Sequence, residues 1–159
     1  LYSLAYTIKM SKKGSHQIKD YFDFVVPPLE GFWWQDGVKG IDYAHKERFN
    51  FISCIRMPEF VTDEVLAWAK KEAAIKKGLD FSPVKLLVLT EGKCVQIMHH
   101  GPFDEEPKTV ALMDQYIREK GYKNDFSNGR LHHEIYMSDA RKMPSQKWKT
   151  VIRHPICKL

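Results

Sequence analysis

Side chains that could do chemistry alternate along residues 130–137. In an extended strand, successive side chains point to opposite faces of a sheet. One face then carries a polar group at every second position: Arg130, His132, Glu134 and Tyr136. The other face is mostly apolar and suits packing against a core. A carboxylate beside a phenol can bind a polar ligand or transfer a proton, so Glu134 and Tyr136 are the candidate catalytic residues.

Both residues also have a purely structural interpretation. Glu134 could be an exposed strand residue that pairs with Arg130, and Tyr136 could be a packing tyrosine. The apolar neighbours of Glu134 favour a place in a cleft.

Aromatic residues make up 13% of the chain and could wall such a cleft. Trp33 and Trp34 are adjacent in an extended segment, so one should fill the core and the other should face the ligand. The sequence does not decide which. The full set of candidate ligand-binding residues, several of which should prove to be core, is Tyr21, Trp33, Trp34, Phe51, Trp68, Met98, His132 and Trp148.

The composition narrows the class of protein. With 159 residues, 43% of them hydrophobic and 28% charged, the chain has the profile of one globular domain. Its net charge of +5 comes from dispersed lysines and arginines, which argues against direct nucleic-acid binding. No apolar segment is long enough for a membrane span, and the three cysteines lack CxxC spacing. We expect a cytoplasmic protein with a small-molecule ligand. The sequence does not decide its oligomeric state.

Metal and cofactor motifs are not apparent. The pairs His99-His100 and His132-His133 are adjacent on strands, so the members of each pair face opposite ways and cannot chelate one ion together. There is no glycine-rich phosphate loop and no nucleophile elbow. The sequence therefore predicts neither a metal nor a cofactor.

Periodicity and breakers predict alternating elements. Helices are expected over residues 1–10 and over 62–77, where Thr62 begins the helix and Gly78 ends it. A third helix is expected from 104 to 120, with an apolar stripe through Val110, Met113, Tyr116 and Ile117. Strands are expected over 21–26, 29–34, 49–57 and 130–137, over 84–89 and 93–99 as a hairpin, and over 148–152. Because residues 1–10 show a helical stripe without a cap, the chain should begin inside a helix.

A short repeat suggests duplication. The segment Ile55-Arg56-Met57-Pro58 recurs as Ile152-Arg153-His154-Pro155, in similar surroundings. We expect an α+β fold of two pseudo-twofold-related βαββ modules that form a curved antiparallel sheet, with helices on one face and a ligand cleft on the other. In this single domain, 1–159, residues 1–60 are the first half-module without its opening strand. Residues 61–159 hold a covering helix and the second half-module.

Three segments resemble the GyrI-like small-molecule-binding family: residues 92–103 (GKCVQIMHHGPF), the strand Glu134-Ile135-Tyr136 followed by Ser138-Asp139, and Arg153-His154-Pro155. The family usually continues its Ser-Asp pair with proline, whereas this chain has Ala140, which affects loop rigidity more than chemistry. The resemblance covers nearly the whole chain and implies that Glu134 lies in a ligand cleft among aromatic rings.

Two further segments, residues 27–34 (PPLEGFWW) and 132–136 (HHEIY), resemble a free-standing subgroup similar to cyclopropanoid cyclopropyl hydrolases. This likeness implies binding of planar aromatic xenobiotics that are cationic or electrophilic, and hydrolysis of strained cyclopropane rings in DNA-alkylating compounds as a detoxification. The alternatives are a non-catalytic drug-binding sensor, like the effector-binding domains of multidrug-responsive regulators, and a gyrase-interacting regulator. Whether the protein is an enzyme stays open at this point.

Overall fold

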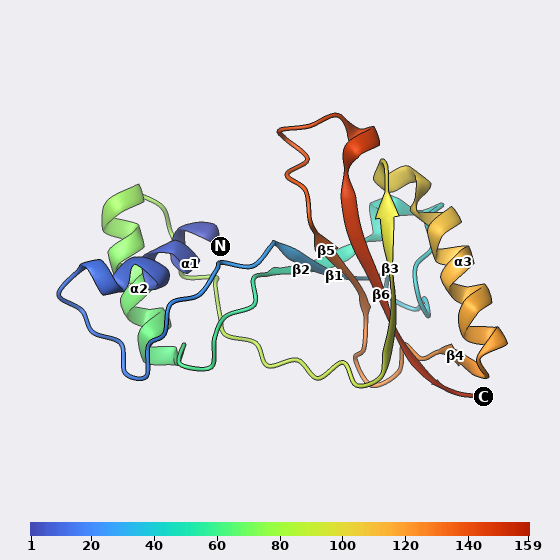
Figure 1. The fold of residues 1–159 in the computed structure, drawn as a ribbon, viewed down its shortest axis with the longest axis horizontal. Coiled ribbons are helices and arrows are strands. Elements are labelled where there is room, and N and C mark those ends of the chain that lie inside the picture. Colours follow the sequence, from blue (N-terminus) through green and yellow to red (C-terminus); the bar gives the residue numbers. More distant parts are fainter. The chain divides into compact units, whose positions relative to one another are not determined.

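The computed structural model describes residues 1–159, which divide into two compact units (Figure 1). The first unit comprises residues 1–27 and 54–89, and the second comprises residues 28–53 and 90–159. None of the helices is both long and apolar enough to cross a membrane.

The first unit is helical. It contains α1 (Tyr2–Lys9), the 3₁₀ turn η1 (Met10–Lys13) and α2 (Asp63–Lys77). The Thr62 hydroxyl caps α2 by accepting from the Val65 amide, and Gly78 ends it in the left-handed conformation, as predicted. The two helices pack around a shared core of Leu4, Ile8, Ile18, Phe60, Val61, Leu66, Ala69, Ala73 and Phe81.

Two segments predicted as strands are not strands. Residues 21–26 are held to α1 instead, because Lys9 pairs with Asp23 at 3.0 Å and the Tyr21 hydroxyl donates to the Lys9 carbonyl at 2.7 Å. Residues 84–89, predicted as half of a hairpin, are extended and largely exposed, with Val88 93% exposed. Alternation favours an extended chain, but a strand also needs a partner edge, and neither segment has one here.

The second unit is an open six-stranded sheet with one helix, α3 (Glu106–Glu119). The strands run in the order β2-β1-β5-β6-β3, and β4 pairs with β6. Together with the helices of the first unit, this sheet confirms the predicted combination of an antiparallel sheet and helices. The strand bounds are β1 (Glu30–Trp34), β2 (Asn50–Cys54), β3 (Cys94–His100), β4 (Tyr122–Asn124), β5 (His132–Tyr136) and β6 (Lys149–Lys158). Short 3₁₀ turns are η2 (Lys46–Arg48), η3 (Phe103–Glu105) and η4 (Ser145–Lys147).

The strand β6 is longer than predicted, because Pro155 does not end it. Before Pro155, β6 pairs with β5, and beyond it Ile156 pairs with Asn124 of β4. Proline has no amide hydrogen to donate, and it stands at the position where β6 changes partner. The repeated segment is therefore part of a strand at residues 152–155, whereas its counterpart at residues 55–58 is irregular.

The register of the sheet decides which side chains share a face. Glu134 lies opposite Gly31 of β1 and opposite Ile152 of β6, and Ile152 lies opposite Ile97 of β3. We call this the acid face. Helix α3 packs against β3, and its first residue, Glu106, meets Glu134. The sequence predicts the cleft away from the helices, but the acid face is turned toward α3, because the carboxyl groups of Glu106 and Glu134 meet there.

Candidate active site

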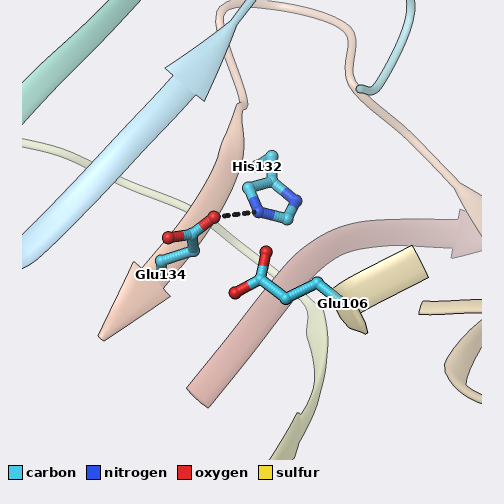
Figure 2. A group of neighbouring side chains, drawn as sticks. All are labelled: Glu106, His132 and Glu134. Atoms are coloured by element: carbon cyan, nitrogen blue, oxygen red, sulfur yellow. Dashed lines mark hydrogen bonds and ion pairs between the residues drawn. The ribbon is translucent and has the colours of Figure 1, made fainter. Parts of the chain in front are cut away.

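Two buried carboxyl groups meet where β5 faces the first turn of α3 (Figure 2). Glu134 is 8% exposed and Glu106 is 2% exposed. The two groups lie close to each other, because the ligand atoms of Glu106, Glu134 and His132 all lie within 4.8 Å of one another. Burial, and then the negative charge of Glu134, raises the pKa of Glu106 far above its ordinary value. Glu106 therefore keeps its proton at neutral pH.

Two imidazoles extend the acid pair. His132 Nε2 lies 3.0 Å from Glu134 Oε1, and His132 Nδ1 lies 2.7 Å from His154 Nε2. Burial, and then the neighbouring His132, lowers the pKa of His154 to about 3, so the His154 ring is uncharged. Because a carboxylate can only accept, we assign a proton to His132 Nε2 and the proton between the rings to His154 Nε2. His132 thereby orients Glu134.

The Tyr136 hydroxyl connects the acid pair to an indole ring. Trp33 Nε1 donates to Tyr136 Oη over 2.9 Å, and the negative charge of Glu134 acts on this hydroxyl. Burial, and then the charge of Glu134, raises the pKa of Tyr136, so the group stays a phenol. Gly31 leaves room for this contact, because a Cβ at that position would lie 2.6 Å from Tyr136 Oη and 2.7 Å from Trp33 Nε1.

Aromatic rings continue on both sides of the Trp33–Tyr136 hydrogen bond. Trp33 contacts Phe51 with ring centroids 5.1 Å apart and Phe49 with centroids 5.8 Å apart. Phe103 contacts Tyr136 at 6.0 Å and Trp148 at 4.8 Å. We call this set of six rings the aromatic row. It consists of Phe49, Phe51, Trp33, Tyr136, Phe103 and Trp148, and it offers flat apolar surface beside a carboxyl pair.

The loop after β1 brings another phenol to the acid pair. Gln35, 2% exposed, fixes this loop by donating to the carbonyls of Asp42 and His45 at 3.0 and 2.9 Å and accepting from the Asp42 amide at 2.7 Å. Between these anchors lies Tyr43, whose hydroxyl is buried and has no hydrogen-bond partner. Burial, and then the charge of Glu106, raises the pKa of Tyr43, which keeps its proton available for a ligand.

A second charged cluster lies on the other face of β5. His133 stacks on Phe32 with ring centroids 4.0 Å apart and bonds to a different carboxylate at each nitrogen. Its Nε2 lies 2.8 Å from Glu30, and its Nδ1 lies 2.9 Å from Glu91. Arg153 pairs with the other oxygen of Glu91 at 2.8 Å. We call this set the His133 cluster.

The structure brings together only some of the predicted residues. His132, Glu134, Tyr136 and Trp33 are joined by hydrogen bonds, and Phe51 and Trp148 belong to the aromatic row. Trp34 is half-buried and follows Trp33, so it points to the opposite face of β1.

The remaining three predicted residues lie elsewhere. Met98 pairs with Val151, which pairs with Ile135, so it occupies the face opposite Glu134. Tyr21 and Trp68 belong to the first unit, where Tyr21 packs against Phe60 and Trp68 stacks on His16 at 4.0 Å. Their aromatic character suits a core as well as a cleft, and the sequence pattern does not distinguish the two.

Five residues of the site were not predicted from the sequence: Glu106, Tyr43, His154, Phe49 and Phe103. Of the three polar ones, only Glu106 left a usable signal. The buried stripe of α3 runs through Met113 and Ile117, and one further step in the helical repeat falls on Glu106. A carboxyl group on a buried stripe needs a partner, so extending the stripe to the start of the helix would have identified it.

The chain has recognisable relatives. The family model of the GyrI-like small molecule binding domain matches residues 3–156. No curated protein matches the sequence. A crystal structure of a hydrolase from Listeria innocua is 49% identical, with a TM-score of 0.88, and the alignment covers 99% of this chain and 76% of that chain. An uncharacterized conserved protein from the same organism is 51% identical, with a TM-score of 0.89 and the same coverage.

The family match extends through both compact units and includes every residue of the acid pair and the aromatic row. Such domains hold small molecules, and rings beside buried carboxyl groups are suited to that task. The chain belongs to the GyrI-like small molecule binding domain family.

Proposed function

We propose that this protein binds planar aromatic electrophiles along the aromatic row and hydrolyses strained cyclopropane rings of DNA-alkylating compounds, as a detoxification. The observation that carries the proposal is a pair of buried, neighbouring carboxyl groups beside a row of aromatic rings. A related crystal structure described as a hydrolase supports it, as does the resemblance of residues 27–34 and 132–136 to cyclopropanoid cyclopropyl hydrolases.

The residues have complementary roles in this reaction. A flat ligand stacks on the rings, each contact adding ~0.5–1.5 kcal/mol beyond the burial of area. Glu134 takes a proton from a water molecule, whose oxygen bonds to a cyclopropane carbon. The cleaved carbon–carbon bond sends its electron pair into the conjugated carbonyl, whose oxygen becomes a phenolate. Glu106 or Tyr136 donates a hydrogen bond or proton to that oxygen, and the net change is addition of one water.

The test uses a cyclopropane-containing alkylator and detects the hydrated product by mass spectrometry. Glu134→Gln should keep binding, measured by quenching of tryptophan fluorescence, and lose turnover by ~100-fold or more. Glu105→Gln is the matched control for helix α3, because its carboxyl group is exposed and pairs only loosely with Lys108 at 3.9 Å. Hydrolysis by Glu134→Gln at the parent rate would exclude Glu134 as the base.

A non-catalytic drug-binding module is the second candidate. The family description, which names small-molecule binding and no reaction, favours it. The same rings and carboxyl pair would hold cationic aromatic molecules by stacking and cation–π attraction. Tight ligand binding without any hydrated product from the parent protein would select this function over hydrolysis.

A further inference from the structure

Glu106, His132 and Glu134 form a convergent group of metal-ligating atoms. Each residue is buried and offers one such atom, and the three atoms lie within 4.8 Å of one another. The residues come from β5 and α3, far apart in the sequence, so no motif spacing announces them. Zinc binds imidazole nitrogen and carboxylate oxygen at about 2.0–2.2 Å, which requires only a small inward movement of these side chains.

The direction of the ligand atoms distinguishes this group from the His133 cluster. Around His133 the two carboxylates lie at different ring nitrogens, so they cannot reach one ion together, and Arg153 adds a positive charge. Around His132 both carboxyl groups lie on the Nε2 side of the ring, as Figure 2 shows. Only the His132 side therefore offers a centre at which three ligands meet.

An unpartnered atom points to a missing ligand at this centre. Glu106 is only 2% exposed, and its Oε1 is buried without a hydrogen-bond partner. Figure 2 shows the Glu106 carboxyl group directed toward His132 and Glu134. A buried carboxyl oxygen without a partner is costly, and a cation between the three side chains would satisfy it.

The surroundings of His132 also suit a ligand. A metal-binding histidine usually donates its second ring hydrogen to an acceptor, which fixes the ring. His132 Nδ1 lies 2.7 Å from His154 Nε2. When His132 binds metal through its own Nε2, its Nδ1 hydrogen can be donated to His154 Nε2. The set of one imidazole and two carboxylates matches zinc and its transition-metal neighbours, whereas calcium prefers six or more oxygen ligands.

We propose that Glu106, His132 and Glu134 bind one divalent transition-metal ion of the zinc type. Binding itself does not depend on the proposed hydrolysis. Its regulatory consequence rests on that function: a metal-bound Glu134 cannot take a proton from water, so zinc inhibits turnover. Two negative charges and one divalent ion leave the buried centre neutral.

The test adds Co²⁺ to protein freed of metal with EDTA, because cobalt at a four- or five-coordinate site absorbs visible light, and then displaces it with Zn²⁺. We expect one ion per chain, a cobalt band that zinc abolishes, and a higher melting temperature with zinc. Glu106→Gln and His132→Gln should each weaken binding by at least ~10-fold. His45→Gln removes a surface imidazole beside Asp42 and should leave the metal affinity unchanged.

Several results would overturn the inference: no cobalt band, a band that persists in both site variants, or a band lost in His45→Gln. Circular dichroism checks folding, and should His132→Gln unfold, Glu106→Gln decides, since glutamine keeps the size of the side chain. Turnover without metal binding would support the proposed hydrolysis and exclude the metal site. Metal binding by a protein that shows no turnover in its metal-free form would support the metal site and exclude the hydrolysis.

Discussion

His132 and His133 are neighbours on β5, yet their surroundings differ in kind. The carboxylates around His133 are spread over both ring nitrogens and are balanced by Arg153. Those around His132 lie on one side, and its other partner is an uncharged imidazole. Both histidines have carboxyl groups beside them, so residue type alone does not identify a candidate site. What distinguishes the surroundings of His132 is an excess of buried acidic groups, which is stable only with a bound proton, cation or ligand.

The strongest test of this comparison removes the ring of His133. In His133→Ala, Glu30 and Glu91 lose their shared partner and a cavity opens beside Phe32. We expect the free energy of unfolding to fall by about 3 kcal/mol, measured by urea denaturation. His100→Ala, at an exposed position of β3, should change it by less than about 0.5 kcal/mol. Equal effects in both variants would mean that the His133 cluster contributes no particular stability.

The acid face should respond in the opposite way. In Glu106→Gln, the side-chain amide can donate to Glu134 as the protonated acid does, so the free energy of unfolding should stay within about 1 kcal/mol of the parent. Hydrolysis of the cyclopropane compound should nevertheless fall by ~100-fold. Thermal melts and product formation, measured on one preparation, check both statements. A large loss of stability with intact turnover would reverse the comparison between the two faces.

A smaller effect is expected from adding one methyl group at Gly31. In Gly31→Ala, the new Cβ lies where the Tyr136 hydroxyl and the Trp33 indole nitrogen meet, so one ring must move. We expect a loss of about 1–3 kcal/mol in the free energy of unfolding. The tryptophan emission spectrum should also change, because the hydrogen bond to Tyr136 breaks. An unchanged spectrum and stability would show that the rings adapt freely at this position.

The smallest expected effect is the pH dependence from His133. Burial disfavours its charged form, but hydrogen bonds and charges of Glu30 and Glu91 outweigh this and raise the pKa, against Arg153 nearby. The stabilisation is therefore complete below the unfolded pKa of about 6.5 and is lost as the pH rises through the folded pKa.

This pH dependence should be measured on metal-free Glu106→Gln protein, because the substitution removes the carboxyl group whose pKa is raised. His154, whose lowered pKa makes stability rise with pH, contributes in the opposite direction, so the comparison is with the same protein carrying a further His133→Gln substitution. The difference in free energy of unfolding between the two proteins should shrink as the pH rises from 6 toward alkaline values. A difference that grows with pH in this range would contradict the assigned direction.

The sequence predicted those features of the fold that depend on neighbouring residues. The cap at Thr62, the stop at Gly78 and the alternation along β5 depend on residues close in sequence. Contacts between distant segments were less accessible. Residues 21–26 and 84–89 have strand-like alternation but no partner strand, and β6 continues past Pro155 because β4 becomes its partner there.

The candidate site shows the same division. Glu134, Tyr136 and His132 were found because one strand places them on one face. Glu106 comes from another element, so its meeting with Glu134 depends on how α3 packs, although its place on the buried stripe of α3 was a clue. Tyr43 depends on the bonds of Gln35, for which the sequence offers no pattern.

The side-chain hydrogen bonds of Gln35 fix one part of the loop after β1 and leave another part free of such bonds to the Gln35 side chain. One amide side chain fastens the backbone at Asp42 and His45, while residues 36–41 form no part of the acid pair. Residues 36–39 are exposed, so exchanges there should leave the backbone around Tyr43, and with it the place of the Tyr43 phenol beside the acid pair, unchanged.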